Sequence, residues 1–232
     1  MADTAPKTIH FHIGPDRVFE ELFRQVFAPF SDDVNLSFVS SEDYRKHFRD
    51  AVDGGLDQEI PQILNDVCST AETIVLSRPR LLFDGAPMNV NGGGSFYKLD
   101  TIQKGFQGHK VIFHLFLTDH LGYLMRSAQP ESLSASNKQF SWVPLVQTVS
   151  SKVLQGNELL VWNAEGKEFV QTFLSATTGL TGQKLDDLMA KILRTEKVPT
   201  PEAEEQFASQ AALDVFDLDA AFENDIKTLQ LA

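Results

Sequence analysis

The residues best suited to hold an anion near the N-terminus follow a short apolar run. The run Ile9 to Ile13 ends at Gly14, and Arg17 follows three residues later. A strand that turns directly into a helix is a common phosphate site, because helix N-terminal amides and a nearby cation attract negative charge. Gly14 and Arg17 are therefore the first candidates for holding a phosphate-type group.

A second set of candidates follows another apolar run. The run Thr73 to Leu76 is followed by Ser77, Arg78 and Arg80. The carboxyl ends of parallel strands are the usual ligand edge of an open α/β sheet, and two guanidinium groups there could bind an oxyanion. The alternative is that both arginines are simply solvated at the surface.

Three histidines offer a different chemistry. His10 and His12 are two residues apart on a predicted strand and share one face, while His114 lies on another predicted strand. Three imidazoles could bind a transition metal. No carboxylate or thiolate pattern accompanies them, so we expect buried histidines that bond to neighbouring groups, and we predict no metal site.

A nucleophilic triad is another possible chemistry. Ser77, His120 and Asp119 have the required types, but an adjacent aspartate and histidine on one turn cannot both align on one serine. The chain also lacks a G-x-S-x-G elbow. We therefore predict no catalytic residue from this set.

The elements that must position these residues alternate along the chain. Short runs of β-branched and aromatic residues predict strands at Ile9–Ile13, Asn35–Val39, Thr73–Leu76, Lys110–Leu117 and Leu159–Trp162. Apolar spacings of three and four predict helices at Pro15–Phe27, Ser41–Arg49, Ile60–Val67, Leu99–Phe106, Asp119–Ser127, Phe140–Val153, Glu168–Ser175 and Leu185–Leu193. This order predicts a three-layer α/β/α fold with a mostly parallel sheet of about five strands.

Two segments stand apart in composition. Residues 84–95 form a glycine-rich loop, which is either a lid or a flexible connection. Residues 196–232 are strongly acidic. We expect one α/β domain over residues 1–195, with an acidic spacer at 198–205 and one last helix, ending near Leu231, packed on the same domain.

Composition narrows the classes of partner. The chain has 232 residues and a net charge of −12, with an isoelectric point near 4.9, which argues against sequence-independent nucleic-acid binding. Cys68 is the only cysteine, which excludes an internal disulfide and fits a reducing compartment. No apolar run reaches membrane-spanning length, so we expect a cytoplasmic protein that does not bind membranes.

The order of segments and the turn His12-Ile13-Gly14 resemble a known family. They are similar to the sulfotransferase-like branch of the P-loop proteins, whose first strand runs into the motif H-x-G-x-x-K-T-G-[ST]-[ST]. The resemblance covers most of the chain. It implies a P-loop fold whose loop amides and lysine hold the donor 3′-phosphoadenosine 5′-phosphosulfate. Arg17 stands here at the lysine position.

The loop departs from that motif after Arg17. Val18 replaces the threonine, Phe19 the second glycine, and Glu20 and Glu21 the hydroxyl residues. A phenylalanine blocks the close approach of a phosphate to the backbone, and two carboxylates repel an anion. The same residues suit a helix that starts straight off the strand, since acids favour a helix N-terminus.

Two further motifs of the family are altered. The family ends its next strand with leucine-serine and a glutamate that looks like the catalytic base, but here Pro79 holds the glutamate position. Thr118 holds the position of an arginine that binds the 3′-phosphate. Arg126 falls at the family's serine and Ser127 one residue later. A helix turns by about 100° per residue, so the displaced group points elsewhere.

These departures lead to three functional hypotheses. The leading one is a sulfotransferase-like protein that has lost or altered donor binding and acts as a non-catalytic binding or partner protein, for a small anionic molecule or another protein. The second is an active sulfotransferase in which Arg17, Arg78, Arg80 and Arg126 rebuild the anion site. The third is a small-molecule or carbohydrate binder that uses the glycine-rich loop as a lid.

Overall fold

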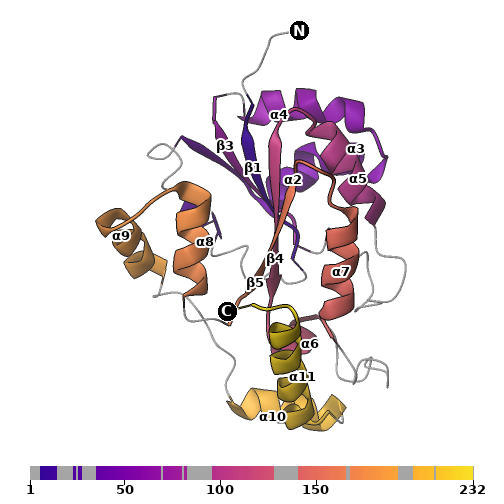
Figure 1. Ribbon diagram of the computed structural model, residues 1–232, viewed down its shortest axis with the longest axis vertical. Coiled ribbons are helices and arrows are strands. Elements are labelled where there is room, and N and C mark those ends of the chain that lie inside the picture. Colours follow the sequence, from indigo (N-terminus) through magenta and orange to yellow (C-terminus); the bar gives the residue numbers. More distant parts are fainter. Residues whose placement is uncertain are drawn as a thin grey trace.

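The protein folds around one parallel sheet with helices on both sides (Figure 1). The computed structural model describes residues 6–14, 23–24, 26–27, 35–68, 70–79, 81–82, 96–127, 141–165, 168–192, 201–211 and 213–231. Within these ranges the predicted three-layer α/β/α fold is confirmed, and each of the five predicted strands is present to within a residue or two.

The sheet has the strand order β2-β3-β1-β4-β5, and every neighbouring pair is parallel. The strands are β1 (Thr8–His12), β2 (Leu36–Val39), β3 (Thr73–Ser77), β4 (Lys110–Leu117) and β5 (Glu158–Asn163). β1, β3 and β4 are almost completely buried, whereas the edge strand β5 is half-buried. Burial on both faces explains why the central strands are continuous apolar runs.

The helices lie between and after the strands. They are α2 (Ser41–His47), α3 (Arg49–Asp53), α4 (Ile60–Cys68), α5 (Phe96–Gly105), α6 (His120–Ser127), α7 (Val143–Lys152), α8 (Phe169–Thr178), α9 (Gln183–Ile192), α10 (Pro201–Ala211) and α11 (Val215–Thr228), with a 3₁₀ turn, η2, at Asp57–Glu59. Of the predicted first helix, Phe23, Arg24, Val26 and Phe27 are described, and all four are helical.

The helix expected over Ser41–Arg49 is confirmed to within two residues as α2, and the short helix α3 follows Phe48. One prediction about helices was wrong. The acidic stretch expected to be a spacer at 198–205 is helical from Pro201 onward, so the C-terminal region has two helices, α10 and α11. Proline is well suited to the first turn of a helix, and the alanine and glutamate residues that follow are strong helix formers.

Each face of the sheet has its own core. Ile9, Phe11 and Ile13 point to one face and pack under α2 to α5 and α7. His10, His12 and their neighbours on β4 point to the opposite face. There the aromatic cluster Phe23, Phe27, Phe116, Phe169 and Phe173 lies between the sheet and α8. We call this second region the aromatic face.

The strand order fixes where the chain changes direction. The connection from β1 leads outward across β3 to β2, whereas the connection from β3 leads the other way, across β1 to β4. Open α/β sheets bind ligands at such a reversal, outside the carboxyl ends of the two strands. The reversal lies between β1 and β3, where His12 and Ser77 are paired in the sheet register.

The C-terminal helices lie at the same end of the sheet as this reversal, next to the carboxyl end of β4. Figure 1 shows α10 and α11 beside α6, below the carboxyl end of β4. Ala208 of α10 and Leu218 of α11 are buried in the same cluster as the core residues of β4. The acidic C-terminal region therefore presents an apolar side to the α/β domain.

Candidate functional site

The candidate site is the end of the sheet where β1 and β3 finish side by side. His12 Nδ1 lies 3.2 Å from Ser77 Oγ, within hydrogen-bonding distance. The backbone N–H of Arg78 donates to the carbonyl of His12 at 3.0 Å, which extends the pairing one residue past β3. Three residues named by the sequence motifs therefore meet at the expected edge.

His12 is a buried, neutral residue. Its side chain points to the aromatic face, where the ring stacks on Phe116 with centroids 4.6 Å apart and meets the edge of Phe23 at 5.1 Å. His12 and Ser77 have exposed fractions of 1% and 0%. Burial lowers the pKa of His12 to about 3. The imidazole is therefore uncharged at neutral pH and adds no positive charge for an anion.

Gly14 is required by the position of the His12 ring. A Cβ atom on Gly14 would lie 2.8 Å from His12 Nε2 and 3.4 Å from the backbone nitrogen of Phe116. The first of these distances is shorter than any normal contact. The histidine and glycine that match the family motif are thus explained here by close packing of a ring against the backbone.

Arg78 leaves the strand toward the other face of the sheet. Its guanidinium carbon lies 5.9 Å from the ring centroid of Tyr44, a cation–π arrangement. Pro79 follows, in the position where a catalytic glutamate was expected from the resemblance. The described residues at this strand end thus include a cation but no carboxylate.

The remaining predicted site residues are only partly described. Arg17 and Arg80 lie outside the described residues, as do the departures from Val18 to Glu21 and the glycine-rich loop. Arg126 and Ser127 belong to α6, on the far side of β1 from β3, but their side chains are not described. Gly14, Ser77 and Arg78 thus lie at one end of the sheet, but the side chains of Ser77 and Arg78 lie on opposite faces.

Thr118, at the family's arginine position, is also buried. It directly follows β4 with an exposed fraction of 2%, and its carbonyl accepts a hydrogen bond from the indole of Trp142 at 2.9 Å. Its hydroxyl has no partner among the described residues. A buried neutral hydroxyl does not supply the positive charge that the resemblance implies for an arginine at this position.

The two other histidines form a hydrogen-bonded chain with a tryptophan. Trp162 Nε1 donates to His114 Nδ1 at 3.0 Å, and His114 Nε2 lies 2.9 Å from His10 Nδ1. An indole can only donate, so neutral His114 carries its proton on Nε2 and donates to His10. Burial, with smaller effects from His10 and His12, lowers the pKa of His114, and burial, aided by Lys110, lowers that of His10 to about 4.

The hydrogen bonds among these histidines and the tryptophan leave few ring nitrogens that could bind a metal ion. The three ring nitrogens of His10 and His114 that face Trp162 or each other are already engaged. Within the described ranges, no group of three histidine, cysteine or acidic residues has the geometry to hold a metal. The histidines instead hydrogen-bond to neighbouring side chains.

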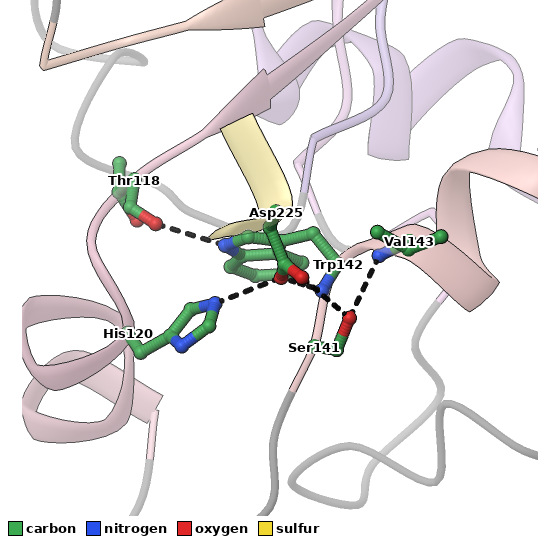
Figure 2. Close-up of polar contacts among 6 residues, drawn as sticks. All are labelled: Thr118, His120, Ser141, Trp142, Val143 and Asp225. Carbon is green, nitrogen blue, oxygen red and sulfur yellow. Dashed lines mark hydrogen bonds and ion pairs between the residues drawn. The ribbon is translucent and has the colours of Figure 1, made fainter. Parts of the chain in front are cut away.

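Sequence reasoning missed a buried polar network below β4 (Figure 2). Asp225 on α11 accepts hydrogen bonds from His120 Nε2 at 3.2 Å, from the Ser141 hydroxyl at 2.7 Å and from the backbone N–H of Trp142. Burial opposes ionisation of Asp225, but these hydrogen bonds outweigh it and hold the pKa of the carboxyl below its usual range. The network joins the starts of α6 and α7 to α11.

The same network shows which partners His120 and Asp119, two members of the triad considered above, have in the structure. His120 bonds to Asp225, whereas its neighbour Asp119 accepts from the backbone of Gly122 and caps α6. Ser141 donates to the same carboxylate, so no histidine nitrogen is poised to remove its proton. Leu218, Phe222, Asp225 and Leu229 share one helical stripe in the sequence, so a carboxylate among apolar residues was the available signal for a buried partner.

None of the helices in the described part of the chain is long and apolar enough to cross a membrane.

Comparison with known proteins finds no relative. No protein-family model matches the sequence, and no curated protein is significantly similar to it.

Proposed function

We propose that this chain is a sulfotransferase-like protein that has lost its donor site and acts as a non-catalytic binding or partner protein. The observation that carries the proposal is the closed pair of His12 and Ser77. Both side chains are fully buried at the switch point of the sheet and hydrogen-bonded to each other. In a working transferase, polar groups at this edge would face the donor and the acceptor.

Among the described residues at this edge, none is placed to act as a base. Sulfuryl transfer to a hydroxyl needs a base within hydrogen-bond reach of the proton that is lost. His12 is too weak a base, with a pKa of about 3, and is enclosed by Phe23 and Phe116. Pro79 cannot accept a proton. These features favour binding without catalysis.

The residue types in the loop support the same proposal. Phe19, Glu20 and Glu21 oppose an anion where the resemblance expects small and hydroxyl residues, and Arg17 alone replaces the lysine. Thr118 supplies a neutral hydroxyl where an arginine would neutralise the 3′-phosphate. Each loss removes a favourable contact to the donor, so the losses together predict affinity far weaker than micromolar.

The test is calorimetric titration with 3′-phosphoadenosine 5′-phosphate, the product form of the donor, accompanied by thermal-shift measurements. The proposal predicts no heat of binding and no change in melting temperature at about millimolar nucleotide. An exposed arginine near the same N-terminal helix, Arg24, provides a matched control for Arg17.

The opposite result would favour the active sulfotransferase with rearranged arginines. Micromolar binding that disappears in Arg17→Ala and persists in Arg24→Ala would show that the altered loop still holds the donor. That outcome would contradict the loss of the donor site.

A further inference from the structure

The sheet ends at a strand whose sequence lacks the usual protection against pairing with another chain. β5 has six residues, of which the central four, Leu159 to Trp162, are apolar. Figure 1 shows it at the border of the sheet, beside β4. Proteins usually protect such edges by keeping them short or by placing lysine or proline in them. The opposite border strand β2 has only four residues, whereas β5 is longer and contains neither lysine nor proline.

The pairing with β4 shows which backbone groups of β5 face outward. The N–H of Ala164, just past the end of β5, donates to the carbonyl of Leu117 at 2.8 Å. In a parallel pair, alternate residues bond to the neighbouring strand, so the even-numbered residues of β5 bond to β4. The backbone groups of the odd-numbered residues face away from β4, and within the described ranges no backbone group pairs with them. We call these residues the β5 edge: Leu159, Val161 and Asn163.

The side chains of β5 are partly exposed on both faces of the sheet. Leu159 and Val161 pack against the core under α7, and Trp162 packs against the aromatic face. None of the three is completely buried, although the apolar residues of β4 beside them are. Pairing with a further strand would therefore cover apolar side chains and also satisfy the outward backbone groups.

The β5 edge carries no charge in a chain that is acidic as a whole. The net charge of −12 opposes contact between copies over most of the surface. The three residues of the edge have no ionisable side chain. The one acid of the strand, Glu158, is paired through its carboxylate with Lys110 Nζ of β4 at 2.9 Å. Two copies can therefore approach each other along β5 without bringing like charges into contact.

We propose that the β5 edges of two copies of this chain pair antiparallel about a two-fold axis, so that two five-stranded sheets join into one. Outward-facing residues must lie opposite outward-facing residues. All three pair when Val161 lies opposite Val161 of the second copy and Leu159 lies opposite Asn163. On the aromatic face, Leu160 then lies opposite Trp162, and such aliphatic–aromatic pairs stabilise neighbouring strands.

This register also keeps the acids of the two strands apart. Glu158 lies opposite Ala164 of the second copy, so the two copies of Glu158 stand at opposite ends of the pairing. Six strand residues span about 20 Å, which exceeds the Debye length of about 8 Å at physiological ionic strength. The proposal is independent of the proposed function, because β1 and β4 separate β5 from the switch point between β1 and β3.

The first test uses the wild-type chain and sedimentation velocity from about 1 to 500 µM. Because a single pair of strands forms a small interface, we expect a reversible dimer with a dissociation constant of about 1–100 µM. Amide hydrogen exchange by NMR then locates the interface. The amides of Val161 and Asn163 should exchange about tenfold more slowly as the dimer forms. Those of Leu160 and Trp162, which bond to β4, should exchange at the same rate at all concentrations.

The second test exchanges charges at the two-fold axis. In Val161→Lys or Val161→Glu alone, like charges face each other across the axis, which should weaken the dimer at least about hundredfold. An equimolar mixture of the two variants places opposite charges there and should recover a dimer. Leu154→Lys is the matched control, because Leu154 is 47% exposed in the turn before β5 and should leave the association unchanged.

Three results would overturn the proposal. The first is a wild-type chain that stays monomeric at all concentrations, which would leave the edge to a strand of another protein. The second is a dimer in which the exchange of the Val161 and Asn163 amides does not change. The third is a dimer that persists in Val161→Lys alone. If neither charged variant folds, the exchange rates of the wild-type amides decide.

Discussion

At the scale of single residues, packing accounts for His12 and Gly14, the two residues on which the resemblance to a P-loop motif depends. The ring of His12 fills the space that a side chain on Gly14 would need, and Phe116 lies behind it. From the sequence, Gly14 was a binding candidate and His12 was part of the motif that carries the resemblance. Their burial, which gives them a different role, depends on residues far away in the chain and is not visible in the motif.

This packing predicts a non-additive pair of substitutions. Gly14→Ala should destabilise the protein by about 1–3 kcal/mol, because its Cβ clashes with the His12 ring. Its backbone has no positive φ, so the effect is steric. In a His12→Ala background, which itself costs about 3 kcal/mol, the same change should cost almost nothing. Urea unfolding of the four proteins measures the coupling, and additive values would show that the ring and the glycine do not interact.

The buried histidines predict an acid-sensitive fold. The pKa values of His10 and His12 fall to about 4 and about 3, and that of His114 is also lowered, so the unfolded chain binds more protons below its ordinary histidine pKa of about 6.5. Stability is therefore present above that pH and is lost as pH falls. His10 and His12 should each remove about 2 kcal/mol between about pH 7.5 and pH 5.

The measurement is the free energy of unfolding in urea as a function of pH. His12→Asn keeps a partner for Ser77 but does not titrate. The slope of its unfolding free energy against pH should therefore correspond to about one proton less than in the wild type. The exposed His47 supplies the control, since His47→Gln removes an imidazole outside the buried cluster. A slope that is the same in all three proteins would mean that His12 is not buried in its neutral form.

At the scale of elements, the sequence predicted most of what forms locally. Strand positions followed from apolar runs, and helix positions from apolar spacings. The helix over the acidic stretch after Pro201 was not predicted, because the prolines and the charge of that stretch are typical of a spacer, although its alanine and glutamate residues favour a helix. The sequence predicted that a last helix packs on the domain, but not which residues α11 contacts, because its polar contacts reach residues more than eighty positions earlier.

The Asp225 network predicts how strongly α11 is held. Asp225→Ala would leave the buried donors of His120, Ser141 and Trp142 without their acceptor, so it should cost about 3–5 kcal/mol in the free energy of unfolding. Asp225→Asn keeps one oxygen acceptor and should cost less. Glu223→Ala, at an exposed position on the same helix, is the control. Equal losses in Asp225→Ala and Glu223→Ala would mean that the network does not anchor α11.

At the scale of the whole molecule, the strand order places the switch point between β1 and β3 and thereby brings His12, Ser77 and Arg78 to one edge. The sequence alone predicted the fold class and the edge. It could not predict that His12 and Ser77 face each other inside the protein, nor that Tyr44 lies beside Arg78, because both pairings are set by sheet order and face.

The most direct test of the proposed loss of the donor site is an NMR titration of the His12 imidazole nitrogens with 3′-phosphoadenosine 5′-phosphate. We expect His12 to remain neutral at pH values from about 5 to 8, as a pKa of about 3 requires, and its signals not to move at about millimolar nucleotide. A change in these signals that saturates at micromolar nucleotide would contradict it, because it would place the donor beside a residue assigned here to packing.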